Sequence, residues 1–362
     1  MKSSCILVTV LTQPDCIKTL SIKQWDTLIR QARKANLLGR LNALCYEHDL
    51  LEHIPEQPAN HLLSAKILAN RQVDTVRWEV NRIQFALERL DIPVILLKGA
   101  AYLLSGLPSA EGRIFTDIDL LFRKNKIEAV EKTLLLHGWF PTHMDEYDQR
   151  YYRTWMHEIP PLTHIKRQSV LDVHHAILPE TARLHPDTEK LLQNIIPIAG
   201  FKNLFTLSPA DMILHSATHL FHDGELEHGL RDLVDLDALL RHFTKDDPDF
   251  WQLLVARAKE IQLTRPLYYA VTYCRRFLDT PVPENIFEAA SDWKPAGIGT
   301  AKIMDQLFKR ALLPDHTSCE DAFTGIARWL LYVRSHYLRM PLFLLIPHLS
   351  RKAWIKRTNN ET

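Results

Sequence analysis

The sequence predicts an α+β protein in which a small mixed β-sheet lies between two helical regions. Glycine is scarce, at 11 of 362 residues against 20 prolines, and long stretches at both ends carry apolar residues at the 3.6-residue period of helices. Short runs rich in β-branched residues lie between these stretches and are typical of buried strands. We therefore expect an N-terminal helical region over residues 1–90, a sheet-bearing core over 91–200 and a C-terminal helical domain over 201–362.

The composition is that of an ordinary globular protein. Hydrophobic residues make up 46% of the chain and charged residues 24%, and the formal net charge is +1. A net charge so close to zero gives no global field that would mark a nucleic-acid-binding protein. The five cysteines are odd in number and form no C-x-x-C pair, which indicates a reducing compartment and no zinc knuckle.

The distribution of apolar residues favours a cytoplasmic protein. The apolar run Ile6–Leu11 is too short for a secretory signal peptide, and no small-residue cleavage site follows it. Nowhere do ~20 apolar residues run together, as a bilayer-spanning helix requires. The most apolar stretch, Met340–Pro347, is far shorter. We therefore expect no transmembrane segment and a cytoplasmic location.

The first 90 residues are expected to be helical. Apolar residues recur at helical spacing over Ile22–His48, and Pro55 and Pro58 interrupt the pattern. A second, longer stripe runs from about Ala59 to Leu90. Stripes of this kind are usually the buried faces of supporting helices, which is the interpretation we adopt.

The spacing of apolar residues changes at Asp91, where the expected sheet begins. Ile92–Leu97 is an apolar, β-branched run suited to a buried strand, and a short helical segment through Leu104 follows it. Gly138 suits the end of a helix, since glycine readily adopts the left-handed conformation. The other elements expected in the core are strands at Ile114–Phe122, within Trp139–Ile165 and at Ser169–Ala176, and a helix at Lys126–His137.

The chain becomes helical again at Ser208. Ser208, Pro209 and Asp211 occupy the N-cap, N1 and N3 positions that these residue types favour at the start of a helix. Apolar spacing predicts helices at Pro209–His222, Leu230–His242, Asp249–Glu260, Arg265–Leu278, Ala301–Leu312 and Phe323–Tyr337.

The strongest chemical signal is the pattern Asp117-Ile118-Asp119 within a predicted strand. Residues i and i+2 of a strand point to the same face, so both carboxylates project together while Ile118 enters the core. A cation relieves the repulsion between two such carboxylates, and hard oxygen ligands suit Mg²⁺ (or Mn²⁺). A D-x-D pattern alone is weak evidence, because solvated surface pairs also produce it.

A second D-x-D pattern in the same chain serves as a comparison. Asp235-Leu236-Asp237 lies in a predicted helix, where residues i and i+2 diverge by about 200°. These carboxylates are not expected to converge, and we interpret the pair as mostly a solvated helix face.

Two further segments carry groups that suit a metal–phosphate site. Lys98-Gly99-Ala100 lies between a strand and a helix, where glycine lets a phosphate approach the backbone closely and Lys98 adds a positive charge. For Lys-Gly alone, a simple strand-to-helix turn is the commoner explanation. Asp172 and His174 alternate on another predicted strand and share a face. Asp172 is either the third carboxylate of a metal site or a polar residue on a half-exposed sheet.

Together these segments resemble the polymerase-β-like nucleotidyltransferases. That superfamily combines a strand, a glycine with a small residue, a helix, an alternating D-x-D strand and a third carboxylate on a later strand. More narrowly, residues 97–240 resemble the large bacterial family of uncharacterised nucleotidyltransferases, although the chain has Gly-Ala where many members of the superfamily have Gly-Ser. The segments that carry this resemblance are L-K-G-A-A at 97–101, R-x-x-x-D-I-D-L-L at 113–121, H-G-W at 137–139, D-V-H at 172–174, L-S-P-x-D-x-x-L-H-x-x-x-H at 207–219 and L-R-D-L-x-D at 230–235.

The resemblance implies a metal-dependent transfer of a nucleoside monophosphate from an NTP to a hydroxyl group, with release of pyrophosphate. Asp117, Asp119 and Asp172 would be the catalytic, metal-binding carboxylates, and the acceptor would be a small molecule, a protein or RNA. The residues expected to bind the nucleotide are Lys98, Gly99, Ala100, Arg113 and Thr116. For Arg113 an ordinary loop salt bridge is an equal alternative. The alternative function is an inactive protein of this fold that binds a nucleotide or a partner.

Electrostatics predicts how these carboxylates behave without a cation. Two unit charges ~5 Å apart at an effective dielectric of ~20 cost about 3 kcal/mol before relaxation and protonation reduce it. We therefore expect Asp119→Asn to leave the cation-free protein as stable as the unmodified chain, or more so.

The helical half adds a candidate substrate cleft. His215 and His219 are four residues apart on one predicted helix. Zinc is one interpretation, but no H-E-x-x-H motif or nearby cysteine accompanies them, and structural, hydrogen-bonded histidines are commoner. We expect instead a polar brace or a substrate cleft, for which the candidate residues are His174, His219, Arg231 and Asp232.

The C-terminal segment from Arg328 onward is basic, with seven basic residues against one acid, Glu361. Contact with RNA or an anionic membrane surface is one interpretation. A packed helix with a solvated basic face is the commoner one. The basic residues are Arg328, Arg334, Arg339, Arg351, Lys352, Lys356 and Arg357, and the interleaved aromatic residues are Trp329, Tyr332, Tyr337, Phe343 and Trp354.

Overall fold

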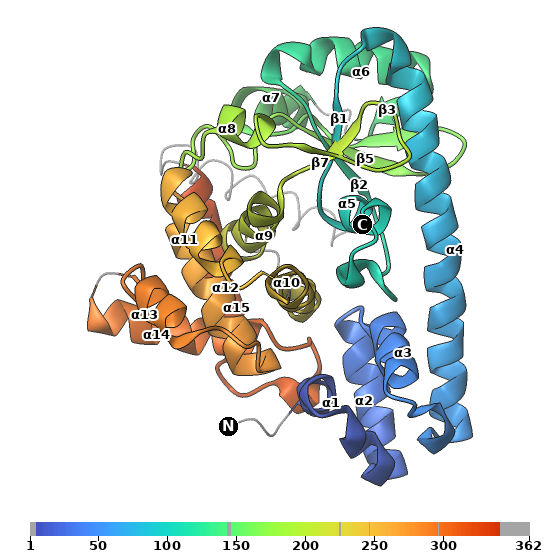
Figure 1. The fold of residues 1–362 in the computed structure, drawn as a ribbon, viewed down its shortest axis with the longest axis vertical. Helices are drawn as coiled ribbons and strands as arrows, with labels where there is room; N and C mark the ends of the chain where they lie inside the picture. The colour runs from blue at the N-terminus through green and yellow to red at the C-terminus, as the bar shows by residue number, and fades with distance from the viewer. Residues whose placement is uncertain (1–4, 143–145, 224–225, 246, 296, 341–362) are drawn as a thin grey trace, which may run out of the picture.

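The computed structural model describes residues 5–142, 146–223, 226–245, 247–295 and 297–340. Figure 1 shows a β-sheet towards one end of the molecule, a long helix along one side, and helices from both ends of the chain at the other end. The predicted α+β architecture, a mixed sheet flanked by N-terminal and C-terminal helices, is confirmed.

The N-terminal region is helical, as predicted, but one of the predicted helices is divided into two. Ser21 begins α2 with a capping box, in which the side chains of Ser21 and Gln24 each accept the other residue's backbone N–H. The helix predicted over 22–48 is two helices, because Asn36 adopts a left-handed φ of 56° and ends α2. The α-helices described here are α1 Ile6–Thr12, α2 Ile22–Lys34, α3 Leu38–Glu47 and α4 Glu56–Leu87.

The sheet has the strand order β3-β4-β5-β2-β1-β7-β6 in the described part of the chain. The central strand β2 pairs antiparallel with β1 and parallel with β5. The strands predicted within 92–97, 114–122 and 169–176 are confirmed in shorter form, whereas β6 and β7 are additional. The strands are β1 Val94–Leu96, β2 Ile118–Leu121, β3 Trp139–Pro141, β4 Leu162–His164, β5 Val170–His174, β6 Ile196–Pro197 and β7 Leu204–Thr206.

The core also contains four helices, two of which pack on the strands β2 and β3. The stretch Trp139–Ile165, for which strands were predicted, holds β3 and β4 and also a helix between them, α7. Its sequence, EYDQRYYRTW, is polar on one side and aromatic on the other, which is the amphipathic pattern of a helix. The helices of the core are α5 Lys98–Leu104, α6 Ile127–Leu136, α7 Glu146–Trp155 and α8 Thr188–Leu192.

Strand register sets the position of the predicted carboxylates. Asp119 on β2 lies directly beside Asp172 on β5, and residues paired across adjacent strands point to the same face. Their neighbours Ile118 and Val173, which point to the opposite face, are 4% and 0% exposed. The sequence alternation therefore directs both carboxylates away from the apolar side of the sheet.

Helix α4 connects the N-terminal helices to the sheet, as its course along one side of Figure 1 shows. It packs against α2 and α3 at one end and against α5 and α6 at the other. Gln72 Oε1 accepts the Phe115 N–H at 2.8 Å, and the buried Glu79 accepts from Arg167 at 2.8 Å. These contacts hold the loop before β2 and the turn between β4 and β5.

The C-terminal region is helical, as predicted, and α9 begins as its sequence indicates: the Ser208 side chain accepts the Asp211 N–H, with Pro209 at the first turn. The predicted helix over 209–222 ends in a π-helical turn at His219–Asp223. Helix α13 is additional. The helices are α9 Pro209–Thr218, α10 Gly229–Thr244, α11 Phe250–Glu260, α12 Thr264–Leu278, α13 Glu284–Ser291, α14 Ile298–Ala311 and α15 Thr324–Arg339. Within the described ranges, none of the helices has the length and apolar character needed to cross a membrane.

Candidate functional site

A cavity of about 680 Å³ lies where the sheet faces the C-terminal helices. The sheet side contributes Asp119 from β2 and Asp172 from β5, and the helical side contributes Arg231 from α10 and Arg339 from α15. All the site residues predicted from the sequence line this cavity except Gly99 and Ala100. The fold thus gathers residues that are more than 100 positions apart in the chain.

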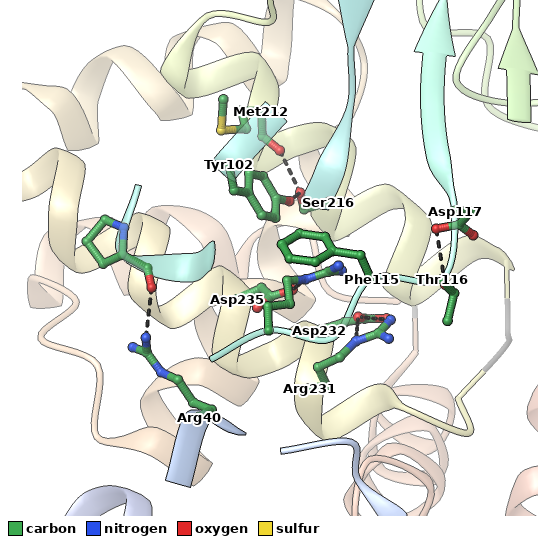
Figure 2. Close-up of polar contacts among 12 residues, drawn as sticks. Arg40, Tyr102, Phe115, Thr116, Asp117, Met212, Ser216, Arg231, Asp232 and Asp235 are labelled. Carbon is green, nitrogen blue, oxygen red and sulfur yellow. Dashed lines mark hydrogen bonds and ion pairs between the residues drawn. The ribbon is translucent and has the colours of Figure 1, made fainter. Parts of the chain in front are cut away.

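Two of the three predicted carboxylates are neighbours across the β2–β5 pair, and the third directly precedes β2. Asp119 and Asp172 are register partners, and Asp117 lies two residues before Asp119. The Thr116 hydroxyl donates to Asp117 Oδ1 at 3.2 Å, as Figure 2 shows. All three residues line the cavity. Their chain positions therefore bring three carboxylates to one side of the sheet.

Asp119 lies between an ammonium group and an imidazole ring. Its side chain is 4% exposed, with Oδ1 2.9 Å from Lys98 Nζ and 3.1 Å from His174 Nε2. Burial by itself raises the pKa of Asp119, but the Lys98 ammonium and the His174 ring outweigh burial and hold the pKa well below its usual range. Lys98 reaches this position from the turn after β1, where it adopts a left-handed φ of 45°. Asp119 is therefore ionised and compensated.

Asp172 is in the opposite electrostatic situation. Its Oδ1 is buried and has no hydrogen-bond partner. Burial, and then the charges of Asp119 and Glu158, raise its pKa to about 8. Burial and the neighbouring Asp119 also raise the pKa of Asp117. An orphaned carboxylate oxygen beside two other carboxylates fits a divalent cation, because hard oxygen ligands are what Mg²⁺ or Mn²⁺ prefers.

Glu158 is a further acidic residue of the cavity, and it was not predicted from the sequence. The segment before β4 forms an antiparallel bridge between Glu158 and His174 at the end of β5. One ligand atom from each of His157, Glu158 and His174 lies within 4.8 Å of the other two. No local pattern in the sequence marks Glu158, because only this long-range bridge brings it to the site.

The second D-x-D pattern does not form a solvated helix face, so that interpretation was wrong. Asp235 on α10 is buried, and its Oδ2 accepts from Arg113 Nε at 2.9 Å. Asp237 is partly buried and accepts from Arg241 and Thr280. The loop salt bridge considered for Arg113 is thus present. Arg113 also lines the cavity.

Close backbone packing fixes the loop that carries Arg113. Gly112 adopts a φ of 65°, and a Cβ on Gly39 of α3 would lie 2.3 Å from the Gly112 carbonyl oxygen. In Figure 2 the Arg40 side chain, from the same helix, donates to the Pro108 carbonyl oxygen at 2.7 Å. The N-terminal helices therefore hold the position of Arg113.

Gly99 and Ala100 do not line the cavity. Both are buried, and a Cβ on Gly99 would lie 2.4 Å from Arg113 Nη1. Glycine at this position makes room for the Arg113 guanidinium. A direct contact of Gly99 and Ala100 with phosphates stays a prediction.

The helical wall of the cavity is polar. Arg231 pairs with the adjacent Asp232 at 2.7 Å, as Figure 2 shows. His219 enters the lining at the start of the π-helical turn, a type of distortion that is frequent at functional sites. Burial and the Lys98 charge hold the pKa of His219 well below its usual range. Among the described residues, His215 and His219 belong to no group of three metal ligands.

The basic C-terminal segment is described only as far as residue 340. Arg328 pairs with Asp315 at 2.6 Å, and Arg334 donates to the Phe221 carbonyl oxygen at 2.9 Å. Arg339 lines the cavity. These contacts favour the packed-helix interpretation for α15. Six predicted contributors lie outside the described residues: Phe343, Arg351, Lys352, Trp354, Lys356 and Arg357.

Comparison with known protein families agrees with this geometry. The model of a family described as uncharacterised nucleotidyltransferases matches residues 21–279. The chain belongs to this nucleotidyltransferase family. The match spans α2 to α12 and so includes the sheet, all three carboxylates and the α9–α10 wall. No curated protein and no solved structure matches the chain.

Proposed function

We propose that the protein transfers a nucleoside monophosphate from an NTP to a hydroxyl group of an acceptor in a reaction that depends on Mg²⁺ or Mn²⁺. The observation that carries this proposal is the juxtaposition of Asp117, Asp119 and Asp172 at the cavity, with Asp172 Oδ1 buried and unpartnered. Membership of a nucleotidyltransferase family supports an NTP as the substrate.

The three carboxylates would hold the divalent cations. When bound, such ions neutralise the triphosphate and stabilise the attacking and leaving oxygens of an in-line displacement. Lys98 compensates Asp119 in the structure described here. With a cation held by the carboxylates, the Lys98 ammonium would pair with the β- and γ-phosphates of the nucleotide.

Arg113 would offset charge that develops on the transferred phosphoryl group. Its guanidinium is held by Asp235 and borders the cavity, so it is oriented before the substrate arrives. Thr116 lines the same edge beside Asp117, where it contacts the nucleotide or orders the carboxylate.

The reaction balances without an additional reagent. The acceptor oxygen attacks the α-phosphorus, the bond from the α-phosphorus to the bridging oxygen breaks, and pyrophosphate leaves. Asp172 would receive the hydroxyl proton on its second carboxylate oxygen when Oδ1 binds a cation.

The acceptor would enter from the helical side of the cavity. His219, Arg231 and Asp232 line that wall opposite the carboxylates and offer hydrogen-bond donors and acceptors. A cavity of about 680 Å³ is within the range of small-molecule sites, roughly 300–1,000 Å³, and leaves room for a nucleotide and part of an acceptor.

Calorimetric titration of the full chain with each NTP, with and without Mg²⁺, tests the nucleotide-binding part of this proposal. We expect binding that requires Mg²⁺ and is lost in Asp117→Asn. Asp237→Asn is the matched control, because it removes an aspartate from a D-x-D pattern that does not line the cavity. Equal binding by wild type and Asp117→Asn would contradict the assignment of the site.

A further inference from the structure

A second group of metal-ligand side chains adjoins the carboxylates in the same cavity. His157, Glu158 and His174 each place one ligand atom within 4.8 Å of the other two. Backbone hydrogen bonds fix the arrangement: Ile159 donates to the Val173 carbonyl at 3.0 Å, and His175 donates to the His157 carbonyl at 2.8 Å. The three side chains are therefore held together by the end of β5 and do not depend on a flexible loop.

Both ring nitrogens of His174 face carboxylates. Nε2 lies 3.1 Å from Asp119 Oδ1, and Nδ1 lies 3.3 Å from Glu158 Oε2. A neutral imidazole has only one N–H, so it can donate to one of these carboxylates while its lone pair faces the other. Donation from Nε2 to Asp119 leaves the Nδ1 lone pair beside Glu158. A cation between Nδ1 and Glu158 would accept the nitrogen lone pair and balance the charge of the carboxylate.

This arrangement is the one in which proteins bind metals through histidine. A ligating histidine usually donates its other N–H to a carboxylate, which fixes the tautomer and the ring orientation. Asp119 is the carboxylate that lies beside the other ring nitrogen of His174. Tetrahedral coordination with bonds of ~2.0–2.1 Å separates ligand atoms by roughly 3.3 Å, which is the spacing of the Glu158 and His174 donors.

His157 supplies a further donor. Its side chain is 7% exposed, and its Nδ1 is buried without a hydrogen-bond partner. Its ring stacks on His174 with the centroids 5.3 Å apart. Buried polar nitrogens are normally hydrogen-bonded, so an orphaned one beside two metal-ligand side chains calls for an explanation.

We propose that His157, Glu158 and His174 bind a Zn²⁺ ion next to the carboxylate centre. Two imidazoles and one carboxylate suit Zn²⁺, whereas Mg²⁺ prefers an all-oxygen set such as Asp117, Asp119 and Asp172. Three protein ligands leave a coordination position open to the cavity that all three residues line. The ion ties the 157–158 segment to β5 and, through His174, positions Asp119. This site does not depend on the proposed transfer reaction.

Titration of the chelator-treated full chain with Co²⁺, followed by visible absorption and by competition with Zn²⁺, tests the proposal. We expect one Co²⁺ per chain with the strong absorption of a four-coordinate site, displaced by Zn²⁺. Glu158→Gln and His157→Gln should weaken binding by roughly tenfold or more, the lower bound known for losing even an outer partner of a metal ligand.

Two variants distinguish this site from the carboxylate centre. Asp117→Asn should bind Co²⁺ nearly as wild type does, and so should His175→Gln, which removes the histidine adjacent to His174 but outside the cluster. Melting temperatures confirm that each variant is folded. His157 is buried, so if His157→Gln does not fold, Co²⁺ binding by Glu158→Gln is the test of the proposal.

Several outcomes would overturn the proposal. Loss of Co²⁺ binding in Asp117→Asn with full binding in Glu158→Gln would place the ion on the carboxylates. Absence of any tight Co²⁺ or Zn²⁺ binding would leave His174 as an imidazolium between Asp119 and Glu158. Because the test measures binding, its result does not depend on whether nucleotidyl transfer is observed.

Discussion

Asp119 and Asp172 are register partners on adjacent strands, yet their surroundings differ sharply. Lys98 and His174 compensate the charge of Asp119, whereas Asp172 has an unpartnered oxygen and faces Asp119 and Glu158. Mutual repulsion was expected for all three carboxylates. In the structure it is concentrated on Asp172 and, to a lesser degree, on Asp117.

Asp172→Asn should therefore stabilise the cation-free protein increasingly as the pH rises. The pKa of Asp172 is about 8 in the folded protein against an ordinary value of 3.8. Between these values the folded chain holds a proton that the unfolded chain has lost, so wild-type stability falls as the pH rises through this window. Asparagine lacks this titration.

Urea unfolding of wild type and Asp172→Asn at pH 5 and pH 8.5 in the presence of a chelator measures the effect. The stability of the variant relative to wild type should increase between the two pH values. A constant difference would mean that Asp172 does not titrate in this window.

Asp119→Asn should behave differently from the expectation based on the sequence. That expectation assumed an uncompensated carboxylate, but Asp119 is paired with Lys98 and His174. Removing its charge breaks the ion pair with the partly buried Lys98 ammonium, which should cost about 3 kcal/mol, at the low end of the range for a broken buried ion pair. Chemical denaturation at pH 7 without divalent cations checks this. Unchanged stability of the variant would contradict the compensation inferred for Asp119.

At the scale of elements, local sequence patterns predicted the features that depend on residues close together in the chain, such as the face of a strand and the start of a helix. Alternation in β2 and β5 placed the aspartates on one side of the sheet, and the residues at 208–211 predicted the start of α9. The break at Asn36 was missed, because a single left-handed residue inside an apolar stripe leaves no strong sequence signal.

Contacts between distant elements could not be predicted in this way. The pattern of α10 suggested a solvated pair of aspartates, but Arg113, 122 residues away, buries and neutralises Asp235. Glu158 joins the site through one bridge to the end of β5. Both cases depend on tertiary packing, about which the local period of a helix or strand carries no information.

The contact between α4 and the sheet provides a test at this scale. Glu79 is 2% exposed and accepts from both Arg167 and Ser169. Glu79→Ala leaves Arg167 without its buried partner and should destabilise the protein by about 3 kcal/mol. Glu128→Ala on α6 is the control, because Glu128 forms only an exposed pair with Lys132.

Urea unfolding of these two variants gives the comparison. A clear loss of stability in Glu79→Ala with little change in Glu128→Ala would support α4 as an anchor of the sheet. Similar stability of both variants would show that the buried contact contributes little.

At the scale of the whole molecule, the cavity depends on all three predicted regions. The core supplies the carboxylates, and the C-terminal helices supply the opposite wall. The N-terminal helices hold Arg113 through Gly39 and Arg40. The divisions at residues 90 and 200 stay predictions, and the family match, which begins at residue 21, runs across both of them.

The central claim is that the chain transfers the α-phosphoryl group with its nucleoside and releases pyrophosphate. The most direct measurement incubates the protein with Mg²⁺, a cell extract and NTPs labelled either at the α-phosphate or at the γ-phosphate. We predict that the α-label appears in an extract component, that the γ-label appears in pyrophosphate, and that Asp117→Asn and Asp119→Asn abolish both. Transfer of the γ-label to an acceptor, or α-label transfer that persists in both variants, would contradict the account.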